Sequence, residues 1–286
     1  MKSKKKNRAS TIFLVAVMIV GIGLMLYPTV SDYWNSLHQS RAIATYVKTV
    51  NNTDYETIER IWTEAEEYNR NLAETGIRYV LPPETKEEYN TQLRTADTDV
   101  MAYVEIPKIK CMLPVYHGTD EAVLQVAAGH LEWSSLPVGG ESSHCVISGH
   151  RGLPSAKLFT NLDEMAEGDI FMLHVLDKTL TYQVDQIRTV LPEELQDLTI
   201  EQGRDLCTLI TCTPYGVNTH RLLVRGTRIE NLDDSGVVIS EATPVDPMLV
   251  TFGAVLLILL VILIWLIVNL IREKRKYKKA GGDTKL

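Results

Sequence analysis

Two short segments carry side chains that together could perform acyl transfer. The first is Ser148–Gly152, which reads SGHRG directly after a run of apolar residues. The second is an apolar run that ends at Cys212, followed by a loop rich in turn residues and then by Arg221. Glycine-rich loops at strand ends are places where a rigid sheet presents side chains to a ligand. The segments therefore predict a site built from His150, Cys212 and Arg221.

These three residue types complement one another chemically. The thiolate is the nucleophilic form of cysteine, and an ordinary thiol with a pKa of about 8.5 needs nearby positive charge to ionise at neutral pH. A histidine can supply that charge and later protonate a leaving amine. An arginine can donate hydrogen bonds to the oxyanion that forms when a carbonyl is attacked. Cys212, His150 and Arg221 thus form a complete acyl-transfer set that needs no metal.

Short strand-like runs surround these residues. They lie at 100–106, 144–149, 169–175, 179–187, 208–212 and 220–229. Such spacing predicts an antiparallel sandwich or barrel. If the last two runs are neighbours, Arg221 returns to within about 5 Å of Cys212. Short helices are expected near 121–128 and 158–165.

The region before the strands is expected to be helical. Residues 39–76 are rich in helix formers, and the apolar residues Ile58, Ile61, Ala65, Tyr68 and Leu72 recur at steps of three and four. This pattern predicts an amphipathic helix that packs against the following domain, with a short coiled coil as the alternative. Residues 77–98 read as an irregular connector.

The remaining cysteines and histidines are better explained as structural. Cys145 and Cys207 lie in or next to strands and read as core residues, with a disulfide between them as an alternative, and Cys111 is expected to pack. His144 and His220 could tune the electrostatics of the site or bond to the backbone. His117, His130 and His174 do not form a zinc-like cluster with the cysteines. The sequence contains no phosphate-cradling glycine loop.

Two apolar segments predict membrane spans. Residues 11–27 contain no charge and follow the basic cluster Lys2–Arg8, while residues 248–271 are apolar and precede a second basic cluster. Because basic residues next to a span favour the cytoplasmic side, both termini are expected inside and residues 29–247 outside. The first segment is expected to be a retained anchor, with a cleaved signal peptide as the alternative.

The exterior segment is strongly acidic. The whole chain has a formal charge of −7, but residues 29–247 hold 17 basic and 34 acidic side chains. An acidic surface repels phosphate backbones, so nucleic acid is not an expected partner.

Several segments together resemble the sortases, specifically the class C group that polymerises pilins. The resemblance is carried by TLITCTPYGVNTHRLLVRG (208–226) and CVISGHRGLPSAKLFTNLD (145–163), and also by YVEIPKI (103–109), VYHGTD (115–120) and AGHLEWSSLPVGG (128–140). It covers residues 99–229 and implies an eight-stranded β-barrel with short helices. It also implies a cysteine transpeptidase on the surface of a Gram-positive bacterium.

The resemblance also implies roles for individual residues. Cys212 would attack the carbonyl after Thr in a Leu-Pro-x-Thr-Gly-like sorting signal, His150 would act as acid and then as base, and Arg221 would hold the oxyanion. Thr211, Thr213 and Asn218 are expected to contact the substrate. A lysine of the next pilin subunit would resolve the acyl-enzyme through an isopeptide bond, without a cofactor or metal.

One feature departs from the class C pattern. Such enzymes carry an Asp-Pro-aromatic lid motif ahead of the barrel, and the connector Arg78–Thr85 has no such triplet. Leu81-Pro82-Pro83 imitates the start of a sorting signal, so it could rest at the site as a pseudo-substrate. The alternative is a linker stiffened by proline.

The expected organisation has six parts. They are an N-terminal signal or anchor span (1–28), a helical extension with a lid-like connector (29–98), the catalytic barrel (99–229), a tether (230–247), a transmembrane helix (248–271) and a basic cytoplasmic tail (272–286). Partners are pilins or surface proteins with a sorting signal, and the membrane. Alternative functions are a sortase that anchors proteins to the cell-wall peptide, a hydrolytic cysteine protease and a non-catalytic adhesion module.

Overall fold

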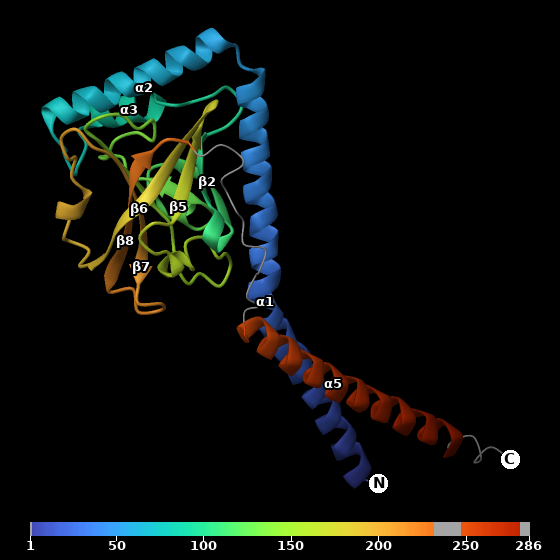
Figure 1. Cartoon of the computed structure of the whole chain (residues 1–286). Helices are drawn as coiled ribbons and strands as arrows, with labels where there is room; N and C mark the ends of the chain where they lie inside the picture. The colour runs from blue at the N-terminus through green and yellow to red at the C-terminus, as the bar shows by residue number, and fades with distance from the viewer. Residues whose placement is uncertain (1, 232–246, 281–286) are drawn as a thin grey trace. The chain divides into compact units, whose positions relative to one another are not determined.

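The computed structural model describes residues 2–231 and 247–280 and divides into two compact units. One unit comprises Met1–Val30 and Ser240–Leu286, and the other comprises Ser31–Ile239. Most of the expected tether, residues 232–246, and the end of the expected tail, residues 281–286, lie outside the described residues. Figure 1 shows the helices and strands.

The larger unit is built on a closed barrel of eight strands in the order β1-β2-β3-β4-β7-β8-β6-β5. The strands are β1 Val100–Ile106, β2 Cys111–His117, β3 Ala128–His130, β4 Ser143–Ser148, β5 Ile170–Val175, β6 Lys178–Val190, β7 Asp205–Thr213 and β8 His220–Ile229. The six predicted strands are confirmed. The runs at 111–117 and 128–130 were not predicted as strands.

The barrel is mixed, so the expectation of an antiparallel sheet was wrong in part. β2 pairs with β3 and β4 pairs with β7 in parallel, while the other neighbours are antiparallel. Parallel neighbours need a long crossover connection, which the 56 residues between β4 and β7 supply by way of β5 and β6. This crossover brings residues after β4 beside residues at the end of β7.

Three helices precede the barrel. They are α1 Lys2–Asn52, α2 Tyr55–Thr75 and α3 Pro83–Thr91. The expected single helix over 39–76 is interrupted at Thr53–Asp54, because the Asp54 carboxylate accepts a hydrogen bond from the Thr57 N–H at 2.9 Å and starts α2 as its N-cap. The connector 77–98, expected to be irregular, contains α3.

The predicted apolar face of α2 is buried. Ile58, Ile61, Ala65 and Tyr68 belong to the main core cluster, together with Trp62. Figure 1 shows α2 and α3 lying across one end of the barrel. The packing interpretation of this helix is therefore confirmed, and the coiled-coil alternative is not needed to explain its apolar face.

The shorter elements differ from expectation mainly in length. α4 spans Glu121–Leu124, within the expected helix at 121–128. The helix expected at 158–165 is reduced to the 3-10 turn η2 Leu162–Glu164; η1 (Pro107–Ile109) and η3 (Gln196–Leu198) are similar turns. Residues 149–169 therefore form a long connection with little regular structure of its own.

The barrel has an interior core and a second apolar cluster. The interior holds side chains such as Phe171, Tyr182 and Leu209, all fully buried. The second cluster comprises Val146, Leu198, Ile210 and Leu223, with Leu131, Trp133, Val190 and Leu195 packed against it. Since side chains alternate along a strand, Ile210 and Leu209 point to opposite faces of β7.

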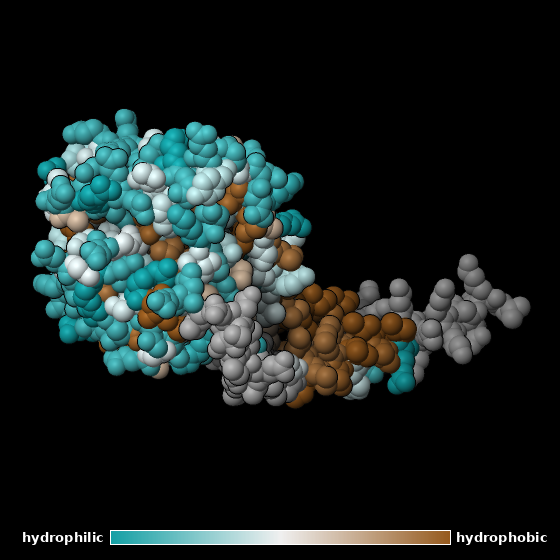
Figure 2. All heavy atoms as spheres, turned by 45° about the horizontal axis from the view of Figure 1, so that its top comes forward, coloured by the Kyte–Doolittle hydropathy of each residue, from teal (hydrophilic) through white to brown (hydrophobic). Residues whose placement is uncertain are grey.

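The smaller unit contains the apolar segments. The segment that begins at Ile12 in α1 is long and apolar enough to cross a membrane, with a mean hydropathy of 2.3. α5 spans Pro247–Ala280, and within its described side chains the apolar stretch Val255–Asn269 is shorter than a span. One candidate span is thus shown within the described residues, and a second is not. Figure 2 shows apolar colouring concentrated on the helices of this unit, whereas the visible barrel surface is mostly hydrophilic.

Candidate active site

The pairing of β4 with β7 places the segment that carries His150 beside the end of β7, where Cys212 lies. Ser148 pairs with Ile210 in the parallel register, and just beyond that pair the Gly149 N–H donates to the Ile210 carbonyl at 3.0 Å. The Thr211 hydroxyl donates to the Gly149 carbonyl at 2.8 Å. Adjacent strands lie about 4.8 Å apart. Gly149 is thus bonded to Ile210 and Thr211 on β7. The next residue along each segment is His150 on one side and Cys212 on the other.

Arg221 reaches Cys212 from the other side of β7. Cys212 pairs with Arg221 in the antiparallel register of β7 and β8. The Arg221 guanidinium donates to the carbonyls of His220 at 3.1 Å and Asn218 at 3.3 Å. These bonds tie the side chain to the end of the β7–β8 loop. Cys212 and Arg221 thus lie on the neighbouring strands β7 and β8, and His150 lies in the loop just after β4, the other neighbour of β7.

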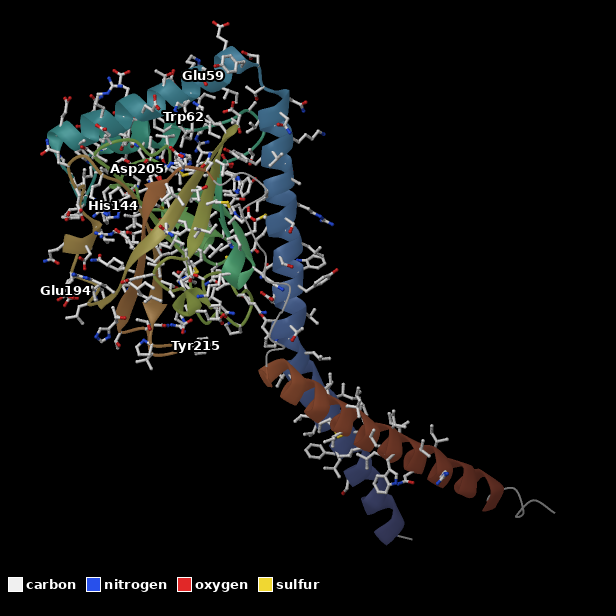
Figure 3. All side chains as sticks on the ribbon, in the orientation of Figure 1. Glu59, Trp62, His144, Glu194, Asp205 and Tyr215 are labelled. Carbon is white, nitrogen blue, oxygen red and sulfur yellow. The ribbon has the colours of Figure 1, made fainter. Side chains whose placement is uncertain are left out.

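The site lies at the end of the barrel away from α2. Figure 3 shows Tyr215, in the β7–β8 loop, at the opposite end from Glu59 and Trp62 on α2. Cys212 lies on the outward face of β7, because Cys207 and Leu209 point into the core and the parity of the strand then turns Ile210 and Cys212 outward. The residue is half-buried.

The other three cysteines are poorly suited to be the nucleophile. Burial raises the pKa of Cys111 to about 12, and its thiol donates to the Leu158 carbonyl at 3.6 Å. Cys145 and Cys207 are register partners on β4 and β7, and both are buried, so neither thiol is accessible to a substrate. Burial raises the pKa of Cys207, whereas for Cys145 burial is outweighed by hydrogen bonds with Cys207 and His130, which lower its pKa. All four cysteines are free thiols, so the alternative of a Cys145–Cys207 disulfide is wrong for this structure.

His150 is held by a hydrogen bond of its backbone, whereas Nε2 of its ring has no hydrogen bond in the described part of the chain. Its carbonyl accepts from the Phe159 N–H at 3.1 Å, while its Nε2 atom has no hydrogen-bond partner among the described residues. The nearest carboxylate oxygen is Oε2 of Glu121 on α4, at 3.7 Å from Nε2. The Nε2 atom is also buried, so it can exchange a proton with a substrate only after the side chains that cover it move.

Gly149 is required by the packing of this loop. A Cβ atom at this position would lie 2.6 Å from Cδ2 of Phe159, a distance that real side chains do not adopt. The glycine lets the Phe159 ring pass under the backbone just before His150. A glycine is thus needed at position 149 because the Phe159 ring lies against its backbone, and not because of an unusual backbone angle.

Arg151 was not singled out in the sequence analysis, although it belongs to the quoted SGHRG motif. Its guanidinium forms an ion pair with Asp163, donates to the Thr213 hydroxyl at 3.3 Å and lies 5.9 Å from the Tyr215 ring centre. It joins the loop after β4 to the loop after β7. Glu121 was also missed, because nothing in the sequence links α4 to His150.

The three residues expected to contact substrate occupy different environments. Thr211 is buried, and its hydroxyl is already used in the bond to Gly149. Thr213 is half-buried and accepts from Arg151. Asn218 is exposed in the β7–β8 loop and has a left-handed backbone with φ of 61°. Thr213 and Asn218 can therefore present polar groups to a ligand, whereas Thr211 acts inside the protein.

Two histidines near the key segments are accounted for by hydrogen bonds. His144 is buried between the Thr199 carbonyl and the Thr208 hydroxyl, each 2.7 Å away, and burial lowers its pKa. His220 bonds to the neighbouring Thr219 hydroxyl. Within the described residues, no group of three or more His, Cys, Asp or Glu side chains is arranged to hold a metal ion.

The connector before the barrel does not place Leu81 on Cys212. Leu81 packs against the main core cluster, and α3 begins at Pro83. Tyr79 instead contacts Trp133 edge-on, with ring centres 5.0 Å apart. The pseudo-substrate interpretation of Leu81-Pro82-Pro83 is therefore wrong in this structure, because the side chain that would mimic the signal is engaged in the core.

Comparisons with known proteins agree with this architecture. The sortase domain model matches residues 104–229. The crystal structure of sortase C1 from Streptococcus agalactiae is similar at 51% identity and a TM-score of 0.66, covering 67% of this chain and 100% of that one. The sortase C structure from Streptococcus pneumoniae is similar at 48% identity and a TM-score of 0.61, with 67% and 97% covered.

A curated relative outside class C is more distant. Sortase D of Bacillus subtilis (strain 168) is 30% identical over 129 residues, which cover 44% of this chain and 62% of that protein. The match to the sortase C structures extends over their full or nearly full length. The chain belongs to the sortase family, whose members are transpeptidases, and it resembles the class C sortases.

Proposed function

We propose that this chain is a membrane-anchored cysteine transpeptidase that joins pilin subunits. The observation that carries the proposal is the pairing of Cys212 with Arg221 on β8, and the parallel pairing of β7 with β4, after which the loop with His150 begins, supports it. The similar sortase C structure from Streptococcus pneumoniae is described in terms of pilin substrate specificity. The sorting signal is proposed to be Leu-Pro-x-Thr-Gly-like.

The first half-reaction forms a thioester. The Cys212 thiolate attacks the carbonyl carbon of the signal threonine, and Arg221 donates hydrogen bonds to the oxygen that becomes negative. Collapse of this intermediate breaks the Thr–Gly peptide bond. The protonated His150 gives its proton to the departing glycine amine, which leaves with the C-terminal part of the signal.

The second half-reaction uses an amine. A pilin lysine enters as the neutral amine, after its ammonium group has lost one proton to solvent. The amine attacks the thioester carbonyl, and the neutral His150 removes the second proton from the attacking nitrogen. The C–S bond breaks, the Cys212 thiolate is restored and an isopeptide bond links the two subunits. Thr213 and Asn218 are proposed to bind the signal, while Thr211 positions Gly149 and so acts through His150.

We also propose the six-part organisation given above, with two spans and an extracellular catalytic domain. The segment beginning at Ile12 supports the first span. The second rests on the apolar sequence of 248–271 and the basic residues that follow it. Reaction of cysteines placed singly at positions 3 and 284 with an impermeant thiol reagent, in Cys212→Ala cells, tests this. Two spans predict labelling of neither cysteine until the cells are opened.

A polymerisation assay tests the function. The full chain in lipid nanodiscs is incubated with a purified pilin that carries a sorting signal, and the products are separated under denaturing conditions. A heat-stable ladder that disappears with Cys212→Ala supports a pilin polymerase. A single product formed only with a cell-wall peptide amine would favour the wall-anchoring alternative, and release of glycine without a new bond would favour hydrolysis.

Arg221→Lys gives a sharper test of the oxyanion role. Lysine keeps the charge but loses the planar fork of donors, so we expect kcat to fall by about 100-fold with little change in KM. Arg228→Lys is the matched control, because Arg228 lies on the same strand and its guanidinium donates to the Thr181 and Ile229 carbonyls instead. Equal losses in the two variants would contradict the proposed role.

A further inference from the structure

The outer part of α1 contacts the loop that carries His150. The Asp32 carboxylate accepts from the Lys157 N–H at 2.7 Å, and the Asn35 side-chain amide donates to the Ser155 carbonyl at 2.8 Å. Both α1 residues belong to the same compact unit as the barrel. They follow the apolar segment in sequence, Asp32 standing five residues after Tyr27.

A third contact extends the same helix face to α4. The Gln39 side-chain amide donates to the Val126 carbonyl at 2.8 Å, just after α4. Residues 32, 35 and 39 are spaced by three and four, so they lie on one face of α1. They are half-buried, whereas Tyr33, Trp34 and Ser36 between them are exposed. We call Asp32, Asn35 and Gln39 the polar stripe of α1.

The polar stripe bonds to the loop that carries His150 and to the residues just after α4, the helix that carries Glu121. The loop from Gly149 to Thr160 carries His150 itself, and its turn at 153–156 is closed by the bridge between Leu153 and Ala156. α4 carries Glu121, the carboxylate nearest the His150 ring. The stripe bonds to the far side of that turn and to the end of α4.

The stripe adds to the bonds that hold the start of this loop, which are those of Gly149 with β7, of the His150 carbonyl with Phe159 and of Arg151 with Thr213. The connection from β4 to β5 is 21 residues long and contains one turn of 3-10 helix. Long connections of this kind are mobile unless they are held. The His150 Nε2 atom has no hydrogen-bond partner among the described residues, so the ring position follows the backbone of its loop.

We propose that the polar stripe of α1 is a positioning element for His150, through which the anchoring helix sets the geometry of the acid–base residue. Asp32 and Asn35 are positioning residues that act through the loop, and Gln39 acts through α4. This inference rests on the proposed function for the role of His150. The hydrogen bonds between α1 and the loop do not depend on the role of His150.

The test compares Asp32→Ala/Asn35→Ala with the wild-type full chain in nanodiscs. Ser36→Ala/Ser40→Ala is the matched control, since both serines are exposed on α1 and the Ser36 hydroxyl bonds only within the helix. Hydrogen–deuterium exchange of the peptide covering 151–159 reports the contact directly. We expect exchange to quicken by about tenfold in the double variant, because the Lys157 amide loses its acceptor, and to stay unchanged in the control.

Kinetics then test whether the contact positions His150. We expect kcat for transpeptidation to fall by about tenfold while KM changes less than about twofold. In the Asp32→Ala/Asn35→Ala variant, the pH dependence of Cys212 alkylation by iodoacetamide should become more like the one measured for the His150→Ala variant. The charged groups around His150 in that profile are Glu121 on α4, Arg151 on its own loop, and Cys212 and Arg221 on the neighbouring strands. Asp32→Asn, which keeps an acceptor oxygen, should restore most of the rate.

The outcomes separate the two proposals. Unchanged exchange in 151–159, or faster exchange with unchanged kcat and alkylation profile, overturns the positioning role. If the pH profile of Cys212 alkylation is the same in the His150→Ala variant as in the wild-type chain, the proposed function is contradicted instead. Exchange would still report whether α1 holds the loop in that case. An equal fall in kcat in the serine control would show a general effect of helix substitutions and would also overturn the inference.

Discussion

The hydroxyl of Thr211 offers a test of how β7 and the His150 loop are joined. Thr211 is 1% exposed and its hydroxyl donates to the Gly149 carbonyl at 2.8 Å. Thr211→Val replaces the hydroxyl with a methyl group of similar size, so it removes the bond without opening a large cavity. The Gly149 carbonyl is then left without this donor, which costs about 1–3 kcal/mol of unfolding free energy.

The same change should impair catalysis. Because Gly149 directly precedes His150, loss of the bond frees the backbone that carries the imidazole. We expect kcat to fall by about tenfold, as small displacements of a catalytic group reduce rates strongly. KM for the signal peptide should change little, because Thr211 is buried and its hydroxyl is not available to substrate.

Denaturant unfolding of the full chain in detergent and steady-state transpeptidation provide the two measurements. Thr211→Ser is the matched control, since it keeps the hydroxyl and removes one methyl group at a cost of about 1 kcal/mol. The serine variant should retain near wild-type kcat. A valine variant with normal kcat would refute the reasoning, and so would a serine variant that loses as much activity as valine. A rise in KM alone would instead support substrate contact by Thr211.

Three further predictions follow from packing and burial. Gly149→Ala should abolish most activity and lower stability by about 2 kcal/mol, because the new Cβ meets Phe159; thermal unfolding and a kcat assay check this. A thiol reagent applied to the native chain at pH 8 should label Cys212 first and leave Cys111 unreacted, since burial raises the pKa of Cys111 to about 12; peptide mass mapping over time would contradict this if Cys111 reacted as fast. Burial lowers the pKa of His117 to about 4, below its value of 6.5 in the unfolded chain. The neutral ring therefore contributes its full stabilisation above pH 6.5. As the pH falls to 4, the free energy of unfolding declines by up to about 3 kcal/mol. His117→Gln should flatten that pH dependence of the unfolding free energy, and an unaltered slope would show that another group is responsible.

The sequence predicted the antiparallel half of the site better than the parallel half. The loop between Cys212 and Arg221 is short, so the two strands had to be neighbours and the register could be inferred. His150 reaches Cys212 through a parallel pair whose strands are 56 residues apart in the chain. Apolar patterning identifies a strand but carries no information about a distant partner. The grouping of His150 with Cys212 was therefore predicted from the chemistry of the two side chains and from the resemblance to sortases, and not from strand pairing.

The missed elements also have physical reasons. β2 contains Pro114, which cannot donate to a ladder and obscures the strand pattern, and β3 has only three residues. The break between α1 and α2 depends on one capping carboxylate, Asp54, inside a stretch of helix formers. By contrast, the apolar spacing of Ile58, Ile61, Ala65 and Tyr68 depends on burial alone and was predicted correctly.

Mass spectrometry of the acyl-enzyme tests the central claim most directly. The full chain is mixed with a sorting-signal peptide in the absence of an acceptor amine, quenched in acid and digested. The account predicts a thioester of the signal up to its threonine on the peptide that contains Cys212, and no adduct in Cys212→Ala. An adduct on Cys111, Cys145 or Cys207 instead, or cleavage of the signal by Cys212→Ala at the wild-type rate, would contradict it.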